Sequence, residues 1–128
     1  MYARDNVAVE GDRQQPPPSD AQLEAATMML RMLADRTRLQ LMWTLSHREC
    51  DVTTLAEAVD VARPAVSQHL AKLRLAGLVR VRRQGRRAFY ATGGGHMRRL
   101  VTEALYAADH QLTGAPDHPA GSGPGGHE

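Results

Sequence analysis

Ten arginine and lysine residues lie between residues 61 and 102, and no aspartate or glutamate lies among them. All fourteen acidic residues fall outside this block, so the formal net charge of +2 hides a strongly polarised molecule. Charges of one sign attract polyanions at long range. A charged run is usually a solvated surface, but these charges fall on regularly patterned segments with nothing nearby to neutralise them, which favours nucleic-acid binding. The ten residues are Arg63, Lys72, Arg74, Arg80, Arg82, Arg83, Arg86, Arg87, Arg98 and Arg99.

Six histidines and one cysteine are the side chains best suited to bind a transition metal ion. Cys50 stands alone, so it offers neither a thiolate cluster nor an intrachain disulfide, and we interpret it as a small buried residue in a reducing cytoplasm. Ligands that are nitrogen and oxygen atoms favour zinc, nickel or cobalt. The histidines are His47, His69, His96, His110, His118 and His127.

Apolar residues at helical spacing predict that helices hold most of these side chains. Ser19 and Gln22 form a capping-box pattern at the start of a first helix. A second helix, over about 35–46, is apolar around much of its circumference, so we expect it to be central in the fold.

Two further helices are joined by a tight turn. Thr53 is expected to cap a short helix over 54–59, and Pro64 to be the first residue of a longer helix that ends before Gly77. A short helix, a turn and a second helix make a helix-turn-helix unit, whose second helix enters the major groove of DNA.

The helix that follows the turn should present one face to DNA. Gln68 can bind adenine through two hydrogen bonds, and Ser67 can bind several bases. Arg63 is a further candidate DNA contact, Lys72 suits a phosphate, and His69 could either contact a phosphate or read a base. The opposite face is expected to be buried and holds Val66, Leu70 and Leu73.

A β-hairpin is predicted next, because valine alternates with arginine, with its turn at residues 84–85. If the turn has two residues, Arg83 faces Arg86 and Arg82 faces Arg87. Like charges that face each other destabilise a strand pair, and a bound polyanion would relieve that repulsion. We therefore predict that these four arginines contact the DNA backbone or the minor groove.

The hairpin spans about 78–91, and three glycines at 93–95 separate it from a last helix over about 96–111. His96 and His110 are 14 residues apart, which places them on one face of that helix, about 21 Å apart along its axis. One helix therefore cannot bring both to one ion, but an antiparallel copy of it across a dimer axis can.

Several motifs stand in order over nearly all of residues 20–110. They are Leu33-Ala34-Asp35-Arg36-Thr37-Arg38-Leu39, Leu55-Ala56-Glu57, Val66-Ser67-Gln68-His69-Leu70-Ala71-Lys72-Leu73, Gly77-Leu78-Val79, and the wing from Gln84 to Arg87 followed by Phe89-Tyr90. Together they resemble the ArsR/SmtB family of bacterial repressors. The resemblance implies a mostly α fold with a β-hairpin wing (α+β), a winged helix-turn-helix. It also implies a homodimer formed by the first and last helices, which binds double-stranded operator DNA and releases it when an inducer, commonly a metal ion, binds.

Within the family the chain most resembles the sensors of nickel and cobalt. The resemblance lies in His96, in the adjacent Asp109 and His110, and in His118 eight residues further on. It implies that these four residues bind nickel or cobalt, with zinc as a less favoured inducer.

Two other ligand sets of the family are incomplete here. Asp51 and Thr53 stand at the cysteine positions of the arsenic, cadmium and lead sensors. Gly94 and Ala107 replace an aspartate and a histidine of the zinc and nickel site on the last helix. These replacements argue against a four-ligand zinc site of that type.

The last helix also limits how the site can be completed. On an ideal helix Asp109 lies about 220° around from His96. It would therefore bind the ion only if the end of the helix frays, or else it would contact the ligands without binding the ion. Glu103 shares the face of His96 and is a candidate substitute, or else a surface partner of Arg99. His127 is a further candidate ligand.

Both ends of the chain look unsuited to a packed fold. Residues 1–19 form a polar arm that ends in three prolines, and residues 114–128 form a tail rich in glycine, proline and histidine. Residues 20–113 remain as one domain, of a size that dimerisation often completes. No apolar run approaches the roughly 18 residues of a membrane span, and no signal peptide is recognisable, so no membrane partner is expected.

Three functions remain open at this point. The first is a metal-responsive repressor that nickel or cobalt releases from operator DNA. The second is a regulator of the same fold whose signal is a redox change at Cys50 or a partner protein. The third, a small metalloenzyme, is remote, because no acid or nucleophile accompanies a closely spaced histidine set and the basic hairpin would have no role.

Overall fold

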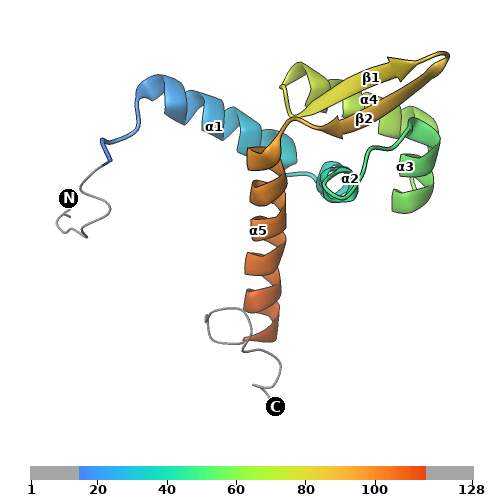
Figure 1. The fold of residues 1–128 in the computed structure, drawn as a ribbon. Coiled ribbons are helices and arrows are strands. Elements are labelled where there is room, and N and C mark those ends of the chain that lie inside the picture. The colour runs from blue at the N-terminus through green and yellow to red at the C-terminus, as the bar shows by residue number, and fades with distance from the viewer. Residues whose placement is uncertain (1–14, 115–128) are drawn as a thin grey trace.

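Five helices and one β-hairpin make up the computed structural model, which describes residues 15–114 (Figure 1). Their order is that of a winged helix-turn-helix, as predicted. The elements are α1 (Asp20–Leu33), α2 (Arg36–Leu45), α3 (Val52–Val59), α4 (Arg63–Leu75), β1 (Val79–Gln84), β2 (Arg87–Thr92) and α5 (Gly95–Thr113).

Side chains that accept backbone hydrogen bonds fix where the first three helices begin. The predicted capping box of Ser19 and Gln22 is confirmed, with both reciprocal bonds present. The predicted cap of α3 at Thr53 is wrong. Asp51, in extended backbone geometry, accepts a hydrogen bond from the N–H of Thr54 at 2.9 Å, so α3 begins two residues earlier than predicted.

The helix-turn-helix unit consists of α3, a turn and α4. Asp60 ends α3 in the left-handed conformation, with φ of 58°. The α4 helix begins at Arg63, so Pro64 is its second residue instead of its first, where a missing N–H is still tolerated. Gly77, with φ of +78°, follows the end of α4 as predicted.

The core lies where α2, α3, α4 and the hairpin meet. The predicted buried face of α4 is confirmed, since Val66, Leu70 and Leu73 are fully buried. The α2 helix is central, as expected, and packs against α1, α3, α4, α5 and β2. Trp43 is nevertheless 48% exposed, because it lines an open groove beside α5.

The hairpin turn lies one residue later than predicted. Its two central residues are Gly85 and Arg86, and the strands close with Gln84 opposite Arg87. Gly85 has φ of +62°. A two-residue turn with positive φ at its first central residue suits glycine and would strain Gln84, so the glycine sets the register.

This register separates the arginines of the wing. Arg83 lies opposite Ala88 and Arg82 opposite Phe89, so no arginine of β1 faces an arginine of β2. The predicted pairs of facing arginines, and the repulsion argued from them, are therefore wrong.

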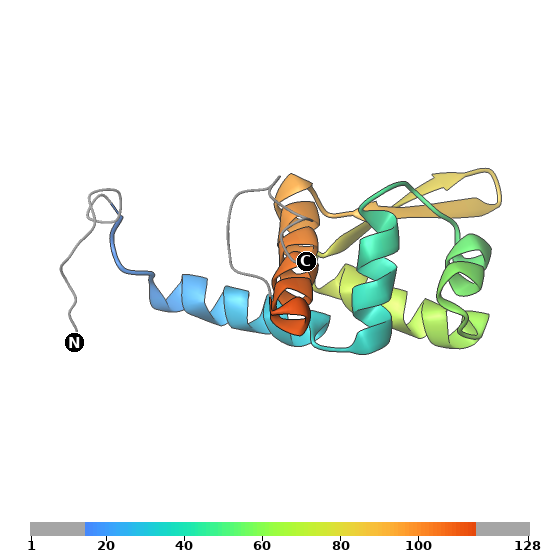
Figure 2. The same ribbon diagram turned by 90° about the horizontal axis from the view of Figure 1, so that it is seen from below.

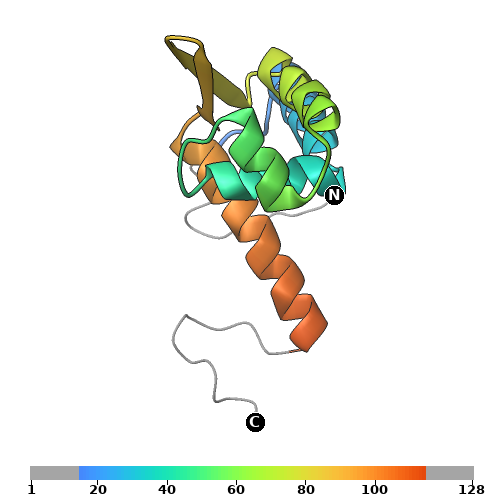
Figure 3. The same ribbon diagram turned by 90° about the vertical axis from the view of Figure 1, so that its right-hand side faces the viewer.

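Two helices project from the body of the molecule. Figure 2 shows α1 reaching away from the helix-turn-helix unit, and Figure 3 shows α5 running far beyond it. Within α1 only Leu33 is buried, while Leu23 and Leu30 are more than half exposed. Near the far end of α5, Tyr106 and Leu112 are 66% and 86% exposed. Apolar side chains gathered on such surfaces are typical of protein interfaces.

Within residues 15–114, no helix is both long and apolar enough to cross a membrane.

Candidate nucleic-acid interface and metal ligands

The outer face of α4 carries four of the five predicted DNA contacts of that helix. Arg63, Ser67, Gln68 and Lys72 are all exposed, because the apolar residues between them hold the opposite face against the core. Their side chains are free to enter a groove of DNA in the manner of a recognition helix.

The fifth predicted contact, His69, is placed differently. It is half-buried, and its Nδ1 lies 3.3 Å from NH1 of Arg38 on α2. A guanidinium only donates hydrogen bonds, so His69 accepts this one. One ring nitrogen of His69 is thus engaged inside the protein. No local pattern around His69 indicates this bond, because the partner is 31 residues away.

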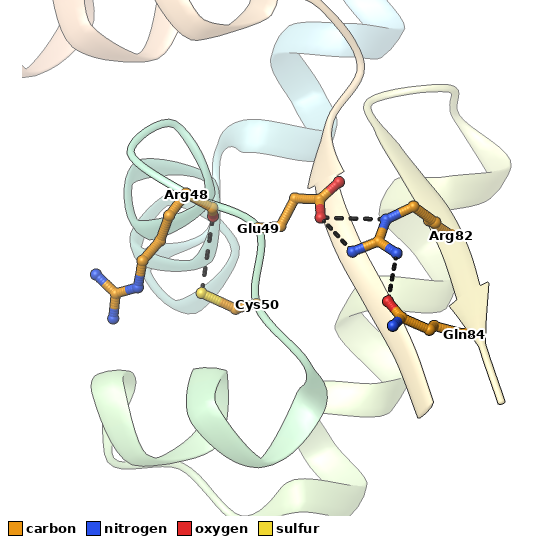
Figure 4. A network of polar contacts seen from close by, with 5 residues as sticks. All are labelled: Arg48, Glu49, Cys50, Arg82 and Gln84. Atoms are coloured by element: carbon orange, nitrogen blue, oxygen red, sulfur yellow. Dashed lines mark hydrogen bonds and ion pairs between the residues drawn. The ribbon is translucent and has the colours of Figure 1, made fainter. Parts of the chain in front are cut away.

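Two of the four predicted DNA contacts on the wing are ion-paired with the loop before α3. Arg82 donates two hydrogen bonds to Glu49, at 2.8 and 3.3 Å, and a third to Gln84 (Figure 4). Arg87 donates to Asp51 at 2.6 Å. The expectation that nothing nearby neutralises the basic block is therefore wrong for these two residues.

The same two arginines also enclose an aromatic ring. The guanidinium carbons of Arg82 and Arg87 each lie 4.9 Å from the ring centre of Phe89, a cation–π geometry. Backbone hydrogen bonds join Cys50 to Tyr90 in both directions, so the loop lies along β2 as a third, bridged segment. These contacts anchor the wing to the helix-turn-helix unit.

The ion pairs shift the ionisation of the acids. A hydrogen bond from Arg82 holds the pKa of Glu49 below its usual value. Hydrogen bonds from Arg87 and from the backbone of Thr54 hold the pKa of Asp51 well below its usual range. Arg82 and Glu49 are both open to water, so their pair contributes little to stability, whereas the side chain of Asp51 is only 19% exposed.

The other two arginines of the wing are placed differently. Arg83 ends the run of arginines on β1 and Arg86 lies in the turn, and both are exposed. Among residues 15–114, neither has an acidic partner within ion-pair distance. The arginines of the wing are thus of two kinds: an anchored pair, Arg82 and Arg87, and a second pair, Arg83 and Arg86, whose charges no acid of the described residues offsets.

Asp51 provides a test of the anchored pair. Because its pKa is depressed in the folded chain, it contributes stability above the ordinary value of 3.8, and that contribution is lost as the pH falls toward the folded value. Asp51→Asn keeps an N-cap but loses the ion pair with Arg87. We expect its free energy of unfolding to be lower at neutral pH and to fall less between about pH 5 and 3.

The measurement is urea unfolding across that pH range. The matched control is Glu57→Gln, which changes an exposed carboxylate of the same helix. An unfolding profile of Asp51→Asn that parallels the wild-type profile would contradict the role given to the Asp51–Arg87 pair.

The predicted metal ligands within the described residues all lie on α5. His96 is exposed in its first turn, His110 is half-buried in its last turn, and Glu103 and Asp109 are exposed. Within residues 15–114 of one chain, no three His, Cys, Asp or Glu side chains come together to hold a metal ion. The structure thus does not gather these residues in one subunit, in line with their separation of about 21 Å along a helix.

Arg99, which the sequence suggested as a surface partner of Glu103, lies beside His96 instead. NH2 of Arg99 lies 2.9 Å from Nδ1 of His96, and since arginine can only donate, Nδ1 accepts. A neutral imidazole then carries its hydrogen on Nε2. Coordination of an ion by either nitrogen would need Arg99 to move away or the hydrogen to change place.

Cys50 is buried, with 3% of its surface exposed, as predicted. Its thiol lies 3.7 Å from the carbonyl oxygen of Arg48 (Figure 4). Burial raises the pKa of the Cys50 thiol, which disfavours the thiolate form that binds metals and reacts with oxidants.

Three predicted features lie outside the described residues. They are the first fourteen residues of the N-terminal arm and the candidate ligands His118 and His127 of the tail.

Comparisons with known proteins identify the family. A family model described as "Bacterial regulatory protein, arsR family" matches residues 35–81. The HTH-type transcriptional regulator KmtR of Mycobacterium tuberculosis is 47% identical over 107 residues, which cover 84% of this chain and 82% of the relative. The HTH-type transcriptional regulator NmtR of the same species is 37% identical over 114 residues, covering 88% and 95% of the two chains.

A solved structure agrees with this similarity. It is the homodimeric winged helix-turn-helix DNA-binding domain from Mycobacterium bovis, described as a possible ArsR-family transcriptional regulator. It superposes with a TM-score of 0.70 at 30% identity, over 82% of this chain and 100% of that one. With its basic recognition helix and wing, the chain belongs to the ArsR family of DNA-binding transcriptional regulators, and not to a class of enzymes.

Proposed function

We propose that the protein is a metal-responsive transcriptional repressor that binds inverted-repeat operator DNA as a homodimer and is released by nickel or cobalt. The observation that carries the DNA part is the positive charge on the wing that no acid of the described residues offsets. Arg83 and Arg86 are exposed and have no acidic partner among residues 15–114, on the same molecule as the polar outer face of α4.

The two basic surfaces have different roles in this proposal. Ser67 and Gln68 on α4 read base edges in the major groove, where serine is tolerant and glutamine prefers adenine. Arg83 and Arg86, helped by Arg63 and Lys72, bind phosphates and so fix the register of the protein on DNA without reading sequence. Arg82 and Arg87 act mainly by holding the wing in place.

The dimer is supported by the two projecting helices. The exposed apolar side chains of α1 and of the far half of α5 would be covered by the same helices of a second copy. The similar domain from Mycobacterium bovis is described as homodimeric. Two copies related by a two-fold axis would place two α4 helices on half-sites about 34 Å apart, one turn of DNA.

The metal site is supported by the chemistry of the donor set. His96 and His110 offer imidazole nitrogens and Asp109 and Glu103 offer carboxylate oxygens, which suit nickel, cobalt or zinc. Nickel and cobalt are favoured by the resemblance to the family's sensors of those metals, which extends to His118. Since one helix keeps His96 and His110 far apart, each site would take His96 from one subunit and His110 from the other.

Release follows from how the ligands are shared. His96 of one subunit and His110 of the other would hold the ion between them. The two α5 helices would then take a fixed separation, and the two α4 helices would be carried with them. If that separation differs from one turn of DNA, metal and operator oppose each other.

The alternative of a redox signal at Cys50 receives no support from the structure, because the side chain is buried and the pKa of its thiol is raised. The same features predict that Cys50 is no metal ligand.

Coordination spectra test the ligand assignment. Nickel or cobalt added to the full chain should give six-coordinate nitrogen and oxygen ligation, with no sulfur-to-metal charge-transfer band, and Cys50→Ser should leave the spectrum unchanged. A charge-transfer band that disappears in Cys50→Ser would show that the ligand set is wrong. Binding to an inverted repeat, selected from random DNA and compared with a single half-site, tests the dimeric DNA complex in the same preparation.

A further inference from the structure

One guanidinium joins three parts of the chain at the corner between α1 and α2. Nε of Arg38 donates a hydrogen bond to the carbonyl oxygen of Met32, in the last turn of α1, at 2.6 Å. NH1 of the same side chain donates to Nδ1 of His69 on α4 at 3.3 Å. The backbone N–H of Arg38 donates to the Asp35 carboxylate, which caps α2, at 2.9 Å.

The direction of the contact with His69 follows from the chemistry of arginine. A guanidinium can only donate, so Nδ1 of His69 accepts the hydrogen bond. Asp35, Arg38 and His69 are all half-buried, which shields the contact from competing water. The hydrogen bond from the backbone of Arg38 also lowers the pKa of Asp35, so Asp35 caps α2 as a carboxylate at neutral pH.

The position of this contact in the fold gives it a consequence for DNA binding. Among the described elements, α1 packs chiefly against α2, and α4 packs against α2, α3 and β1. Arg38 links the end of α1 directly to the middle of α4. The two helices it links are the one proposed to lie in the dimer interface and the one proposed to enter the major groove.

We infer that Arg38 is a positioning residue for DNA recognition: through His69 it holds α4 at a fixed angle to α1, and so sets the distance between the two recognition helices of the dimer. This inference rests on the proposed dimeric, DNA-binding function. It assigns His69 to the scaffold instead of the DNA surface, although Ser67 and Gln68, which directly precede it in the chain, are exposed.

The test compares Arg38→Met with Arg36→Met in the full chain. Both variants remove one positive charge from the first turn of α2, and Arg36 is exposed with no ion-pair partner among residues 15–114. Each is titrated against the inverted repeat that the wild-type protein selects from random DNA. A second duplex carries one additional base pair between the half-sites.

On the selected repeat, Arg38→Met should bind about tenfold more weakly than wild type, a loss typical of a hydrogen bond to a charged group. Its preference for the selected repeat over the lengthened one should also shrink, because α4 is no longer held at one angle. Arg36→Met should match wild type on both duplexes. Equal behaviour of the two variants overturns the inference, and so does a uniform loss on both duplexes accompanied by a lower melting temperature.

Variants of His69 separate positioning from direct contact with DNA. His69→Asn keeps an acceptor near the place of Nδ1 and should bind more like wild type than His69→Ala does. Arg38→Met combined with His69→Ala should bind no worse than Arg38→Met alone, since both remove one interaction. If His69→Ala instead lowers the salt dependence of binding, and its effect adds to that of Arg38→Met, His69 contacts phosphate and the inference is wrong. Failure of wild type and Arg36→Met to bind any inverted repeat would refute the proposed function itself.

Discussion

Replacing Arg83 and Arg86 with alanine is expected to weaken binding to every DNA sequence, on the order of tenfold for each arginine. The plot of log affinity against log salt concentration should become flatter by about four units, one for each phosphate that is no longer bound, because the homodimer loses both arginines from each of its two wings. The reason is the division of the wing, in which these two side chains carry charge that no acid of the described chain offsets. Fluorescence anisotropy with a specific and an unrelated duplex, over a salt series, measures both effects.

Two control variants show whether the effect is specific to Arg83 and Arg86. Arg36→Ala with Arg48→Ala removes the same charge from exposed positions outside α4 and the wing, and should leave the salt slope within error of wild type. Arg82→Ala with Arg87→Ala removes the anchored pair, whose charges are already balanced by Glu49 and Asp51, and should flatten the slope less. An unchanged slope in the Arg83 and Arg86 variant would mean that these two side chains do not touch phosphate.

Replacing His96 or His110 with alanine is expected to abolish the metal response while leaving metal-free DNA binding intact. Both side chains lie on α5, outside the recognition helix and the two strands of the wing. The coupling free energy between metal and DNA binding that these variants lose should be about 1–3 kcal/mol, the usual range for two linked ligands. Operator affinity with and without nickel or cobalt measures it. His47→Ala, which removes an exposed histidine in tilted ring contact with Trp43, is the matched control and should respond like wild type.

The tail is tested by a chain that ends at Thr113. It should bind DNA like the full protein, because residues 114–128 contain no arginine or lysine. Its release by nickel or cobalt should be weaker if His118 completes the site. Equal release by the shortened and the full chain would remove His118 and His127 from the ligand set and leave a site on α5 alone.

The fold could be predicted where local rules and burial agree. The capping box at Ser19 and the buried face of α4 follow from spacing alone, and both are confirmed. The wing register could not be predicted in the same way, because it depends on which residue takes positive φ. Gly85 takes the positive φ in place of Gln84, and this shift of the turn by one residue changes the cross-strand partner of every residue in the hairpin.

The site was harder to predict because its contacts join distant parts of the chain. Arg82 and Arg87 form ion pairs with acids that lie 33 and 36 residues earlier in the chain. The basic block therefore contains no acid in the sequence but has acidic neighbours in the folded chain. The pairing of Arg99 with His96 lies one helical turn away and was within reach of sequence reasoning, since residues three apart share a helix face. A cross-subunit metal site cannot be read from one chain, because its geometry is set by the dimer.

Release of DNA by metal is measured most directly by titrating the full chain onto its selected inverted repeat with and without a saturating amount of nickel or cobalt. Affinity should fall by about 5- to 150-fold with metal, and operator DNA should weaken metal binding by the same factor. Unchanged operator affinity, in a sample where one nickel or cobalt ion per site is shown to be bound, would contradict the proposal that this protein is a metal-released repressor.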